Sequence, residues 1–233
     1  MKLIEYCYNP PRDEIEFLYD DNDISIVIKP AGLLTVPGNV SRDSLVVRLK
    51  QKNLNYNPIH RLDTSTSGIV LLSKNKRANQ ILSKLFSLRN VQKFYVAYVK
   101  GIINNDCGVV NYPMSRDFLA KSYTNAPIQK TDYVNGKNAL TFYRVVAREE
   151  HLNRTLVLLE PYTGRTHQLR HHMKCINHSI EGDCLYGDGV AGERLKLHSC
   201  YLRFNHPTSG AVIKVFDTPE FCAHVNLGLY LPE

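Results

Sequence analysis

Residues 60–75, HRLDTSTSGIVLLSKN, concentrate chemically active side chains in a short stretch. An imidazole (His60), a guanidinium (Arg61), a carboxylate (Asp63) and four hydroxyls fall within eight residues. The apolar run 69–72 that follows predicts a strand. A loop at the mouth of a strand is held in place yet accessible, which is typical of functional sites. Asp63 is therefore the first candidate for chemistry, although an aspartate beside an arginine is also typical of a surface ion pair.

Other chemistries find weaker support in the residue types. His167 and His171 are four apart on a predicted helix, but Gln168 stands where a zinc protease would have its glutamate, and no third ligand is close in sequence. The chain contains neither of the glycine-rich nucleotide-binding patterns, GxGxxG and GxxxxGK[ST], nor the serine nucleophile pattern GxSxG. The sequence therefore predicts no metal site and leaves Asp63 as the main candidate.

The elements that must position Asp63 follow from hydrophobic periodicity. Apolar residues at three- and four-residue spacing predict a helix over about 76–89, and two apolar faces over 93–101 predict a central strand. Shorter helices are expected from Asp43 or Ser44 onward and over 166–175. Further strands are expected at 24–28, at 142–147 and 155–159 as a hairpin, and on both sides of a turn at 206–210.

The two least regular stretches are the N-terminus and residues 104–137. Pro10 and Pro11 break any regular element near the start, so residues 1–18 are expected to form an irregular arm. Residues 104–137 are rich in turn signals, and only a strand pair is expected there.

Length and composition bound the class of protein. The 233 residues are 43% hydrophobic, which is enough for a real core, and no apolar run reaches the ~20 residues needed to span a bilayer. Six cysteines lie scattered without a CxxC pair, which is typical of free thiols. We expect a cytoplasmic monomer.

Charge is distributed unevenly along the chain. Lysine and arginine total 29 against 22 acidic residues, a formal net charge of +7. Residues 74–100 contain seven basic residues and no acidic one. A polyanion such as RNA or DNA would account for this imbalance, and so would an ordinary solvated helix face. Charge alone leaves both interpretations open.

The segment HRLDTSTSG resembles the pattern HRLDxxTSG of the RluA-type pseudouridine synthases. Further segments resemble that family in the same order: KPAG at 29–32, KFYVAYVKG at 93–101, TGRTHQLRHHM at 163–173, GDCLYG at 182–187 and LHSCYLRFNHP at 197–207. The resemblance spans nearly the whole chain, about 19–215. Two departures, Tyr98 and residues 177–179, concern substrate choice more than reaction type.

The resemblance implies an α+β fold with a long mixed, mainly antiparallel sheet, flanking helices and a central catalytic cleft. It implies one catalytic domain over 1–233, with no separate N-terminal RNA-binding domain, as in one subgroup of the family. That subgroup modifies the uridine at position 32 in the anticodon stem-loop of certain tRNAs and the uridine at position 746 in a hairpin of 23S rRNA. RNA is therefore the expected partner, and no membrane is expected.

The reaction implied by the resemblance breaks the bond between N1 and C1′ of uridine and joins C5 to C1′. Reactant and product are isomers, so no cofactor is consumed and none is expected; no metal is expected because the histidines lack a third ligand. Asp63 would act as a nucleophile or assist formation of a glycal intermediate, and both routes stay open. Arg165 matches the basic partner that keeps the carboxylate ionised through a two-pronged contact. Tyr95 matches a tyrosine that stacks on the uracil and relays the C5 proton, although by residue type alone it is a packed strand aromatic.

The remaining candidates would contact the RNA. Leu169 resembles the apolar residue that covers the base from the other side. By residue type alone it is an ordinary core leucine, and the two roles are compatible. The target base must be flipped out, and His60 and Arg61 are candidates for bracing the gap, Arg61 being the better because guanidinium planes stack on bases. Lys29 would hold the RNA backbone or support the catalytic loop. The predicted RNA-contacting set is His60, Arg61, Leu169, Lys29, Arg170 and Lys93.

Two other classes of protein remain as alternatives. A non-catalytic RNA-binding or RNA-chaperone protein could share the fold and the basic surface, but binding alone requires none of Asp63, Tyr95 and Arg165. A hydrolase acting on glycosidic bonds would need a second carboxylate, and the loop offers no acidic residue besides Asp63.

Overall fold

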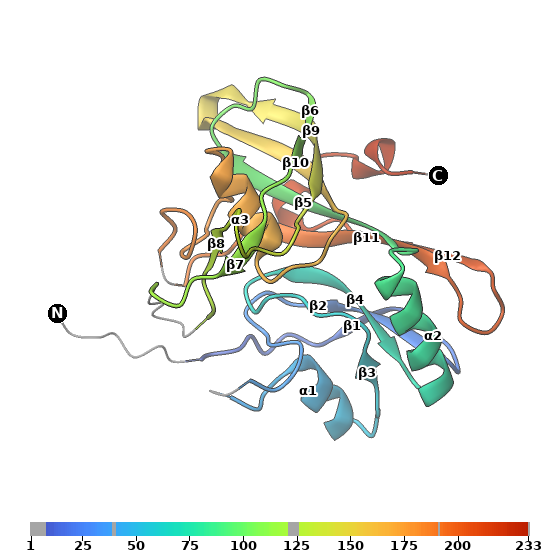
Figure 1. The fold of residues 1–233 in the computed structure, drawn as a ribbon. Coiled ribbons are helices and arrows are strands. Elements are labelled where there is room, and N and C mark those ends of the chain that lie inside the picture. Colours follow the sequence, from blue (N-terminus) through green and yellow to red (C-terminus); the bar gives the residue numbers. More distant parts are fainter. Residues whose placement is uncertain (1–7, 39–40, 121–125, 191, 233) are drawn as a thin grey trace. The chain divides into compact units, whose positions relative to one another are not determined.

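The computed structural model describes residues 8–38, 41–120, 126–190 and 192–232. The chain forms two compact units (Figure 1). The first unit contains Val96–Leu197, and the second contains Asn9–Tyr95 together with His198–Glu233. The single catalytic domain expected over 1–233 stays a prediction.

The second unit is built on a mixed, mainly antiparallel set of strands. β1 (Glu16–Asp20), β2 (Ile24–Lys29), β4 (Ser67–Ser73) and β11 (Leu197–Asn205) are neighbours in that order. β2 is antiparallel to both β1 and β4, whereas β11 is parallel to β4. β12 (Val212–Phe216) pairs with β11, and the short β3 (Asn57–Pro58) pairs with β4. The 3-10 turns η2 (Glu220–Cys222) and η3 (Leu227–Tyr230) follow β12.

Two helices belong to this unit, and local capping sets where each begins. α1 (Leu45–Gln51) starts after Ser44, whose Oγ accepts the Val47 N–H at 3.4 Å. α2 (Lys76–Ser87) starts after Asn75, whose Oδ1 accepts the Ala78 N–H at 2.8 Å. Both helices were expected from the sequence. Leu82 of α2 is fully buried in the core that β2, β4 and β11 form.

The N-terminal arm is shorter than the sequence suggested, because β1 begins at Glu16 inside the range expected to be irregular. β1 is held by its hairpin partner, with Glu16 opposite Ile28 and Asp20 opposite Ser25. The turn between them is fixed by Asp21, whose carboxylate accepts two backbone N–H groups at 2.8 Å. This strand follows from pairing with the apolar strand β2, so its own composition gave little signal. Residues 1–7 lie outside the described part of the chain.

The boundary between the units falls within β5 (Gln92–Lys100), and the first unit contains its second half, from Val96 onward. Its strands follow the order β5, β10 (Arg154–Pro161), β9 (Thr141–Glu149) and β6 (Cys107–Val110). β9 and β10 form the expected hairpin, joined through η1 (Glu150–Leu152). β7 (Met114–Arg116) and β8 (Gln129–Thr131) form a separate two-stranded sheet. α3 (Gln168–Cys175) contributes Leu169 and Met173 to the core.

Strands and helices together place the protein in the α+β class with a mixed, mostly antiparallel sheet, as predicted. No helix within the described ranges is long and apolar enough to cross a membrane.

Candidate active site

The loop that carries Asp63 is tied to the turn that follows β2. Lys29 Nζ donates to the carbonyl oxygens of Leu33 at 2.7 Å, Pro30 at 2.9 Å and Thr64 at 3.2 Å. The Gly32 N–H donates to the same Thr64 oxygen at 2.7 Å. Lys29 is 0% exposed, so its ammonium neutralises carbonyl dipoles inside the protein. Of the two roles predicted for Lys29, burial favours support of the catalytic loop over contact with the RNA backbone.

A second tie holds the residue directly before Asp63. The Thr35 hydroxyl donates to the Leu62 carbonyl at 2.9 Å and accepts the Leu62 N–H at 3.2 Å. Asp63 then opens a tight turn in which its carbonyl accepts the Thr66 N–H at 3.1 Å. The Asp63 side chain is half-buried, whereas its neighbours Leu62 and Thr66 are buried. The loop backbone is therefore fixed on both sides of the carboxylate.

The end of the loop docks directly on β11. Ser67 and Gly68, the first residues of β4, pair with His198 and Ser199. A Cβ at Gly68 would lie 2.3 Å from the Ser199 carbonyl oxygen, and the Gly68 backbone has φ of 112°. Only glycine allows this approach without displacing the backbone. The glycine of the HRLDTSTSG segment is thus required by packing.

Tyr95 lies next to this junction, at the end of β5 that belongs to the second unit, and it is 9% exposed. Its phenol makes a hydrogen bond with the Ser199 side chain, and the Asp63 charge acts on it. Burial is the main reason that the pKa of Tyr95 is raised; the Ser199 hydrogen bond opposes the shift and the Asp63 charge adds to it. Tyr95 is therefore a neutral phenol near Asp63, and the structure brings these two predicted residues together.

His60 has a structural role in the loop. Its Nε2 accepts the Leu71 N–H at 3.0 Å, and its ring stacks on Phe86 with centroids 5.1 Å apart. Burial, and then the positive charge of Lys93, lower the pKa of His60 to about 3, so the ring is neutral. A neutral ring already bonded to the backbone is poorly placed to brace displaced bases. The geometry thus disfavours the RNA contact predicted for His60.

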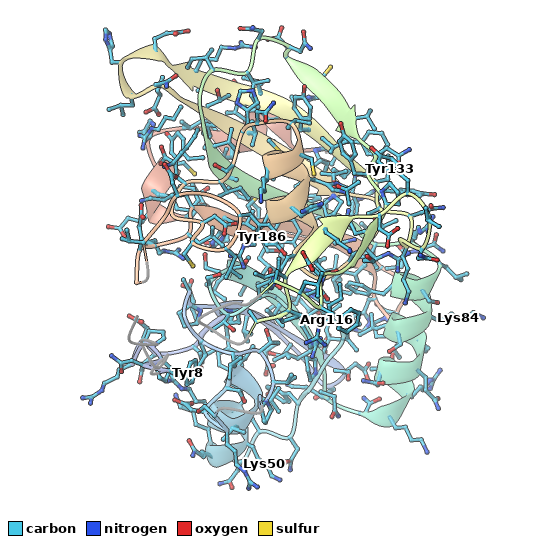
Figure 2. All side chains as sticks on the ribbon, turned by 60° about the vertical axis from the view of Figure 1, so that its left-hand side comes forward. Tyr8, Lys50, Lys84, Arg116, Tyr133 and Tyr186 are labelled. Carbon is cyan, nitrogen blue, oxygen red and sulfur yellow. The ribbon has the colours of Figure 1, made fainter. Side chains whose placement is uncertain are left out.

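Arg61 is accessible for the predicted contact with RNA. Arg61 is exposed and makes no hydrogen bond or ion pair within the described part of the chain. Lys93 is half-buried on β5. The three basic side chains of α2, those of Lys76, Arg77 and Lys84, are exposed, and Lys84 extends outward from the helix (Figure 2).

In the first unit, Arg165 and Leu169 lie at the start of α3. Arg165 is exposed, and its Nε donates to the Asn138 carbonyl at 3.0 Å. The Arg165 N–H donates to Gln168 Oε1 at 3.0 Å, and the same oxygen accepts the Thr163 hydroxyl at 2.7 Å. Leu169 is 7% exposed. Gln168, which the sequence analysis had considered only as a missing zinc-protease glutamate, therefore fixes the turn that presents Arg165.

Arg170 is a structural residue in this unit. Its Nε and one terminal nitrogen each donate to Asp183 at 2.7 Å, and the two side chains are 4% and 0% exposed. Burial opposes ionisation of Asp183, but the hydrogen bonds and charge of Arg170 outweigh it and lower the pKa of Asp183. A buried, bidentate arginine has its charge satisfied within the protein. This arrangement argues against the RNA contact predicted for Arg170.

The two histidines considered as metal ligands serve as hydrogen-bond partners. His171 Nε2 lies 3.0 Å from the Thr131 hydroxyl, and His167 Nδ1 lies 3.1 Å from the Tyr186 hydroxyl. The ring of Tyr186, labelled in Figure 2, meets both imidazoles edge to face. Across the described ranges no three histidine, cysteine or acidic side chains are grouped so that they could hold a metal ion.

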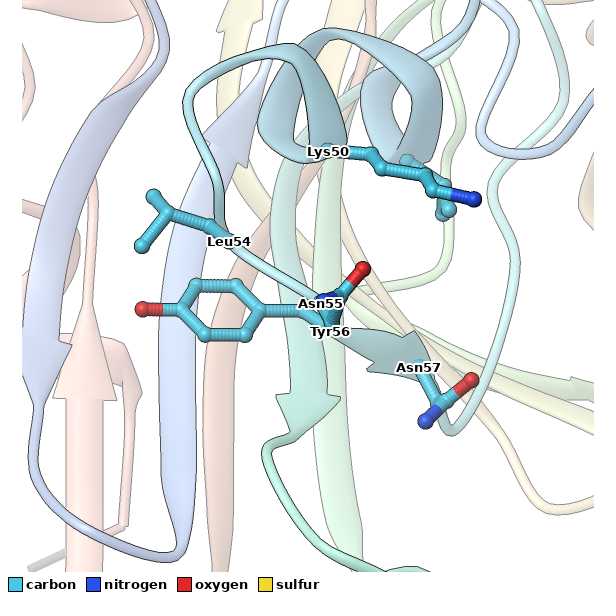
Figure 3. A pocket seen from close by; sticks show the side chains of 6 residues that line it. Lys50, Leu54, Asn55, Tyr56 and Asn57 are labelled. Atoms are coloured by element: carbon cyan, nitrogen blue, oxygen red, sulfur yellow. The ribbon is translucent and has the colours of Figure 1, made fainter.

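The predicted site residues thus fall into two sets. Asp63 and Tyr95 belong to the second unit, where the Asp63 charge acts on the Tyr95 phenol, and Arg165 and Leu169 are neighbours in the first. That the two sets share one site stays a prediction. Sequence reasoning missed Ser199; the segment LHSCYLRFNHP carried the only signal for it. A pocket in the second unit is lined by residues of α1 and of the segment after it and contains none of the predicted site residues (Figure 3).

Comparisons with known proteins show the family of the chain. Residues 23–174 match the family described as RNA pseudouridylate synthase. The chain is 40% identical over 230 residues to the dual-specificity RNA pseudouridine synthase RluA of Vibrio vulnificus, covering 95% of this chain and 89% of the relative. It is 43% identical over 216 residues to the protein of the same name from Haemophilus influenzae, covering 90% and 95%.

A solved structure, human RNA pseudouridylate synthase domain containing 1, is similar with a TM-score of 0.75 at 27% identity. The similarity covers 91% of this chain and 86% of that one. A second human structure, RNA pseudouridylate synthase domain containing 4, has a TM-score of 0.70 at 23% identity, covers 90% of both chains and supports the fold alone.

Proposed function

Because the chain belongs to the RNA pseudouridylate synthase family, we propose that it converts uridines of both tRNA and rRNA to pseudouridine, with Asp63 as the catalytic carboxylate. The protein is an RNA pseudouridine synthase, and RNA is its substrate. The proposed targets are the uridine at position 32 of tRNA anticodon stem-loops and the uridine at position 746 of a 23S rRNA hairpin. The names of the relatives state a dual specificity, which supports two RNA targets, and the family resemblance suggests these two positions.

One observation carries the site assignment: the half-buried Asp63 is held by its loop next to the buried Tyr95 phenol. Ties from Lys29, Gly32 and Thr35 fix the loop backbone on both sides of the carboxylate. A carboxylate fixed in advance loses little freedom when the sugar approaches, which is a main source of rate enhancement. Asp63 would act at C1′ of the uridine, as a nucleophile or by assisting loss of the base.

Tyr95 would act as a neutral phenol. Its raised pKa means that the hydroxyl keeps its proton at neutral pH, so it is no preformed base. It can stack on the uracil through its ring and pass the C5 proton through its hydroxyl while it is hydrogen-bonded to Ser199. This role requires only that the base lies over the Tyr95 ring after the bond to the sugar breaks.

Arg165 would supply the positive charge that keeps Asp63 ionised while substrate excludes water. The guanidinium is exposed, and only its Nε is used by the Asn138 carbonyl, which leaves the terminal nitrogens to face a carboxylate. Leu169, close by on α3, would cover the other face of the uracil. Both roles follow from the family resemblance and require that the two units place these residues against Asp63 in the RNA complex.

Arg61 is the proposed brace for the gap that the flipped base leaves. It is exposed, directly adjacent to the Asp63 turn, and its planar guanidinium can stack on bases or bind phosphate. Lys93 and the basic residues of α2 would contact the RNA backbone. The proposed enzyme is a cytoplasmic monomer that uses no metal. It consumes no cofactor, because uridine and pseudouridine are isomers.

The substrate assignment is tested with two synthetic RNAs, a tRNA anticodon stem-loop and a 23S hairpin, each with its target uridine labelled with tritium at C5. Tritium release from both at comparable kcat/KM is the expected result. Matched RNAs in which the target uridine is exchanged with a neighbouring cytidine serve as controls and should release nothing. Release from only one RNA would refute dual specificity, and release from neither would refute both targets.

A further inference from the structure

A chain of three polar side chains, two of them buried, follows the loop that carries Asp63 and has no role in the chemistry described so far. Ser67 Oγ and His198 Nδ1 are joined by a hydrogen bond of 2.8 Å. On the other side of the ring, His198 Nε2 lies 2.7 Å from Asp217 Oδ2. Ser67 and His198 are each 3% exposed, and all three residues belong to the second unit.

His198 lies between the loop that carries Asp63 and the residue that supports Tyr95. Ser67 ends the turn that begins at Asp63, and His198 pairs with it across the junction of β4 and β11. The next residue on β11 is Ser199, whose side chain makes the hydrogen bond with the Tyr95 phenol. His198 therefore links the loop that carries Asp63, through Ser67, to Ser199, which is hydrogen-bonded to Tyr95.

A serine, a histidine and an aspartate also form the triad of many hydrolases, but the contacts here are reversed. In a hydrolytic triad the serine meets Nε2 and the aspartate meets Nδ1. Ser67 instead meets Nδ1, and it is almost completely buried, so no substrate carbonyl can reach its oxygen. The arrangement suits a structural tie.

Asp217 provides the charge that orients the ring. It follows β12 directly, and its N–H donates to the Cys200 carbonyl at 2.9 Å, which fixes it beside β11. The Asp217 oxygen is close to Nε2 without the alignment of a hydrogen bond, so the contact is mainly electrostatic. A carboxylate at this distance favours a proton on Nε2, which leaves Nδ1 as the acceptor for the Ser67 hydroxyl.

We propose that His198 is a positioning residue for pseudouridine formation: with Asp217 it fixes Ser67, and thereby sets the placement of Asp63 relative to Tyr95. The inference rests on the proposed roles of Asp63 and Tyr95. Misplacement of reacting groups by about 1 Å costs on the order of a hundredfold in rate. Loss of the tie should therefore lower kcat and leave KM for RNA nearly unchanged, because Ser67 and His198 are almost completely buried and offer RNA little to contact.

The test compares His198→Gln and Ser67→Ala with His206→Gln as the matched control. His206 lies just beyond β11, is 7% exposed and pairs with Asp21 at 2.9 Å, so it repeats the buried histidine and aspartate pair away from the loop. Tritium release under saturating RNA gives kcat, its concentration dependence gives KM, and thermal unfolding reports the fold. We expect kcat to fall roughly 10- to 100-fold in both loop variants and by less than about twofold in His206→Gln.

A double variant separates positioning from general destabilisation. If His198 acts through Ser67, combining Ser67→Ala with His198→Gln should lower kcat no further than the worse single change. Multiplicative losses, a kcat unchanged in Ser67→Ala, or equal losses in His206→Gln would each overturn the proposal. Failure of the proposed function itself would look different, since the unaltered protein would then release no tritium from either RNA.

Discussion

Asp63 and Tyr95 make opposite demands on their surroundings. In the proposed reaction Asp63 acts as an ionised carboxylate that the substrate must reach, and its side chain is half-buried at the start of a turn. The phenol must keep its proton, and its pKa is raised by burial and by the Asp63 charge, against the Ser199 hydrogen bond. The loop therefore leaves the Asp63 carboxylate partly exposed, whereas β5 holds the Tyr95 phenol in a buried position.

Removing only the Tyr95 hydroxyl tests whether the phenol relays the C5 proton. Tyr95→Phe keeps the ring for stacking, so RNA binding and KM should change little. General acid and base contributions are typically 10²- to 10⁴-fold, and we expect kcat to fall by at least ~100-fold. Single-turnover tritium release measures this loss. An unchanged single-turnover rate would show that stacking alone is the role of Tyr95.

The sequence could predict these two residues and mistook the role of others. HRLDTSTSG and KFYVAYVKG place Asp63 and Tyr95 by resemblance, and the structure brings them together. The same resemblance placed Lys29 and Arg170 among the candidates for RNA contact, with support of the catalytic loop as the alternative for Lys29. Their burial depends on three carbonyl groups and on Asp183, none of which periodicity can place beside them.

At the scale of elements, the approach of β4 to β11 positions the catalytic loop. Gly68 allows the two backbones to meet, and the pairing is confined to Ser67 with His198 and Gly68 with Ser199. So short a parallel contact leaves the loop free to rise toward solvent immediately before it.

Adding one methyl group at Gly68 should disrupt this junction. Gly68→Ala would place Cβ 2.3 Å from the Ser199 carbonyl oxygen at a φ of 112°, which forces the strands apart. We expect a loss of at least ~2 kcal/mol in the free energy of unfolding together with a loss of activity. Gly210→Ala is the control, because nothing lies within 4 Å of its Cβ at a φ of 72°. Urea unfolding of both variants should show a markedly smaller loss in the control.

The exposed basic side chains of α2 form the second element with a predicted role. Each lysine that binds phosphate contributes ~0.7–0.9 to the slope of log K against log salt concentration. Replacing Lys76 and Lys84 with glutamine should reduce that slope by roughly 1.4–1.8. Binding of the anticodon stem-loop, measured by fluorescence anisotropy at several salt concentrations, tests this.

Lys50 and Lys52 at the end of α1 are the matched pair for this experiment. Both are exposed, and their replacement with glutamine removes the same charge. Equal slopes for the two double variants would show that α2 is an ordinary solvated face, the alternative that composition left open.

Periodicity predicted α2, the β9 and β10 hairpin and the strand pair around residues 206–210 because each is set by local signals. β1 was missed, since it depends on pairing with β2 and on Asp21 closing the turn. The start of α3 was also placed slightly early; His167 has a φ of 53°, so the helix begins only at Gln168.

At the scale of the whole molecule, two neutral histidines make stability depend on pH. The pKa of His60 is lowered to about 3, mainly by burial, and that of His171 to about 4, also mainly by burial. In the unfolded chain both titrate near 6.5. Below pH 6.5 these histidines bind protons in the unfolded state but stay neutral in the folded state. Proton binding then favours unfolding, so the stability present above pH 6.5 is lost as the pH falls.

We therefore expect the free energy of unfolding to fall by up to ~1.4 kcal/mol per pH unit for each histidine between pH 6 and pH 4. His171→Gln should reduce the slope of the free energy of unfolding against pH by the contribution of one histidine. His151→Gln, at an exposed position in η1, should leave it unchanged. Urea unfolding at pH 7, 6, 5 and 4 measures all three proteins, and an identical slope for His171→Gln would contradict the assigned cause.

The most direct test of the account replaces Asp63 with asparagine, which keeps the shape of the side chain and removes its charge. RNA binding and thermal unfolding should match the unaltered protein, and tritium release from C5-labelled RNA should vanish even at enzyme excess. Asp106→Asn, at an aspartate whose side chain is 86% exposed, controls for the loss of one negative charge and should remain fully active. Tritium release that persists in a folded, RNA-binding Asp63→Asn protein would contradict the central claim that this carboxylate performs the reaction.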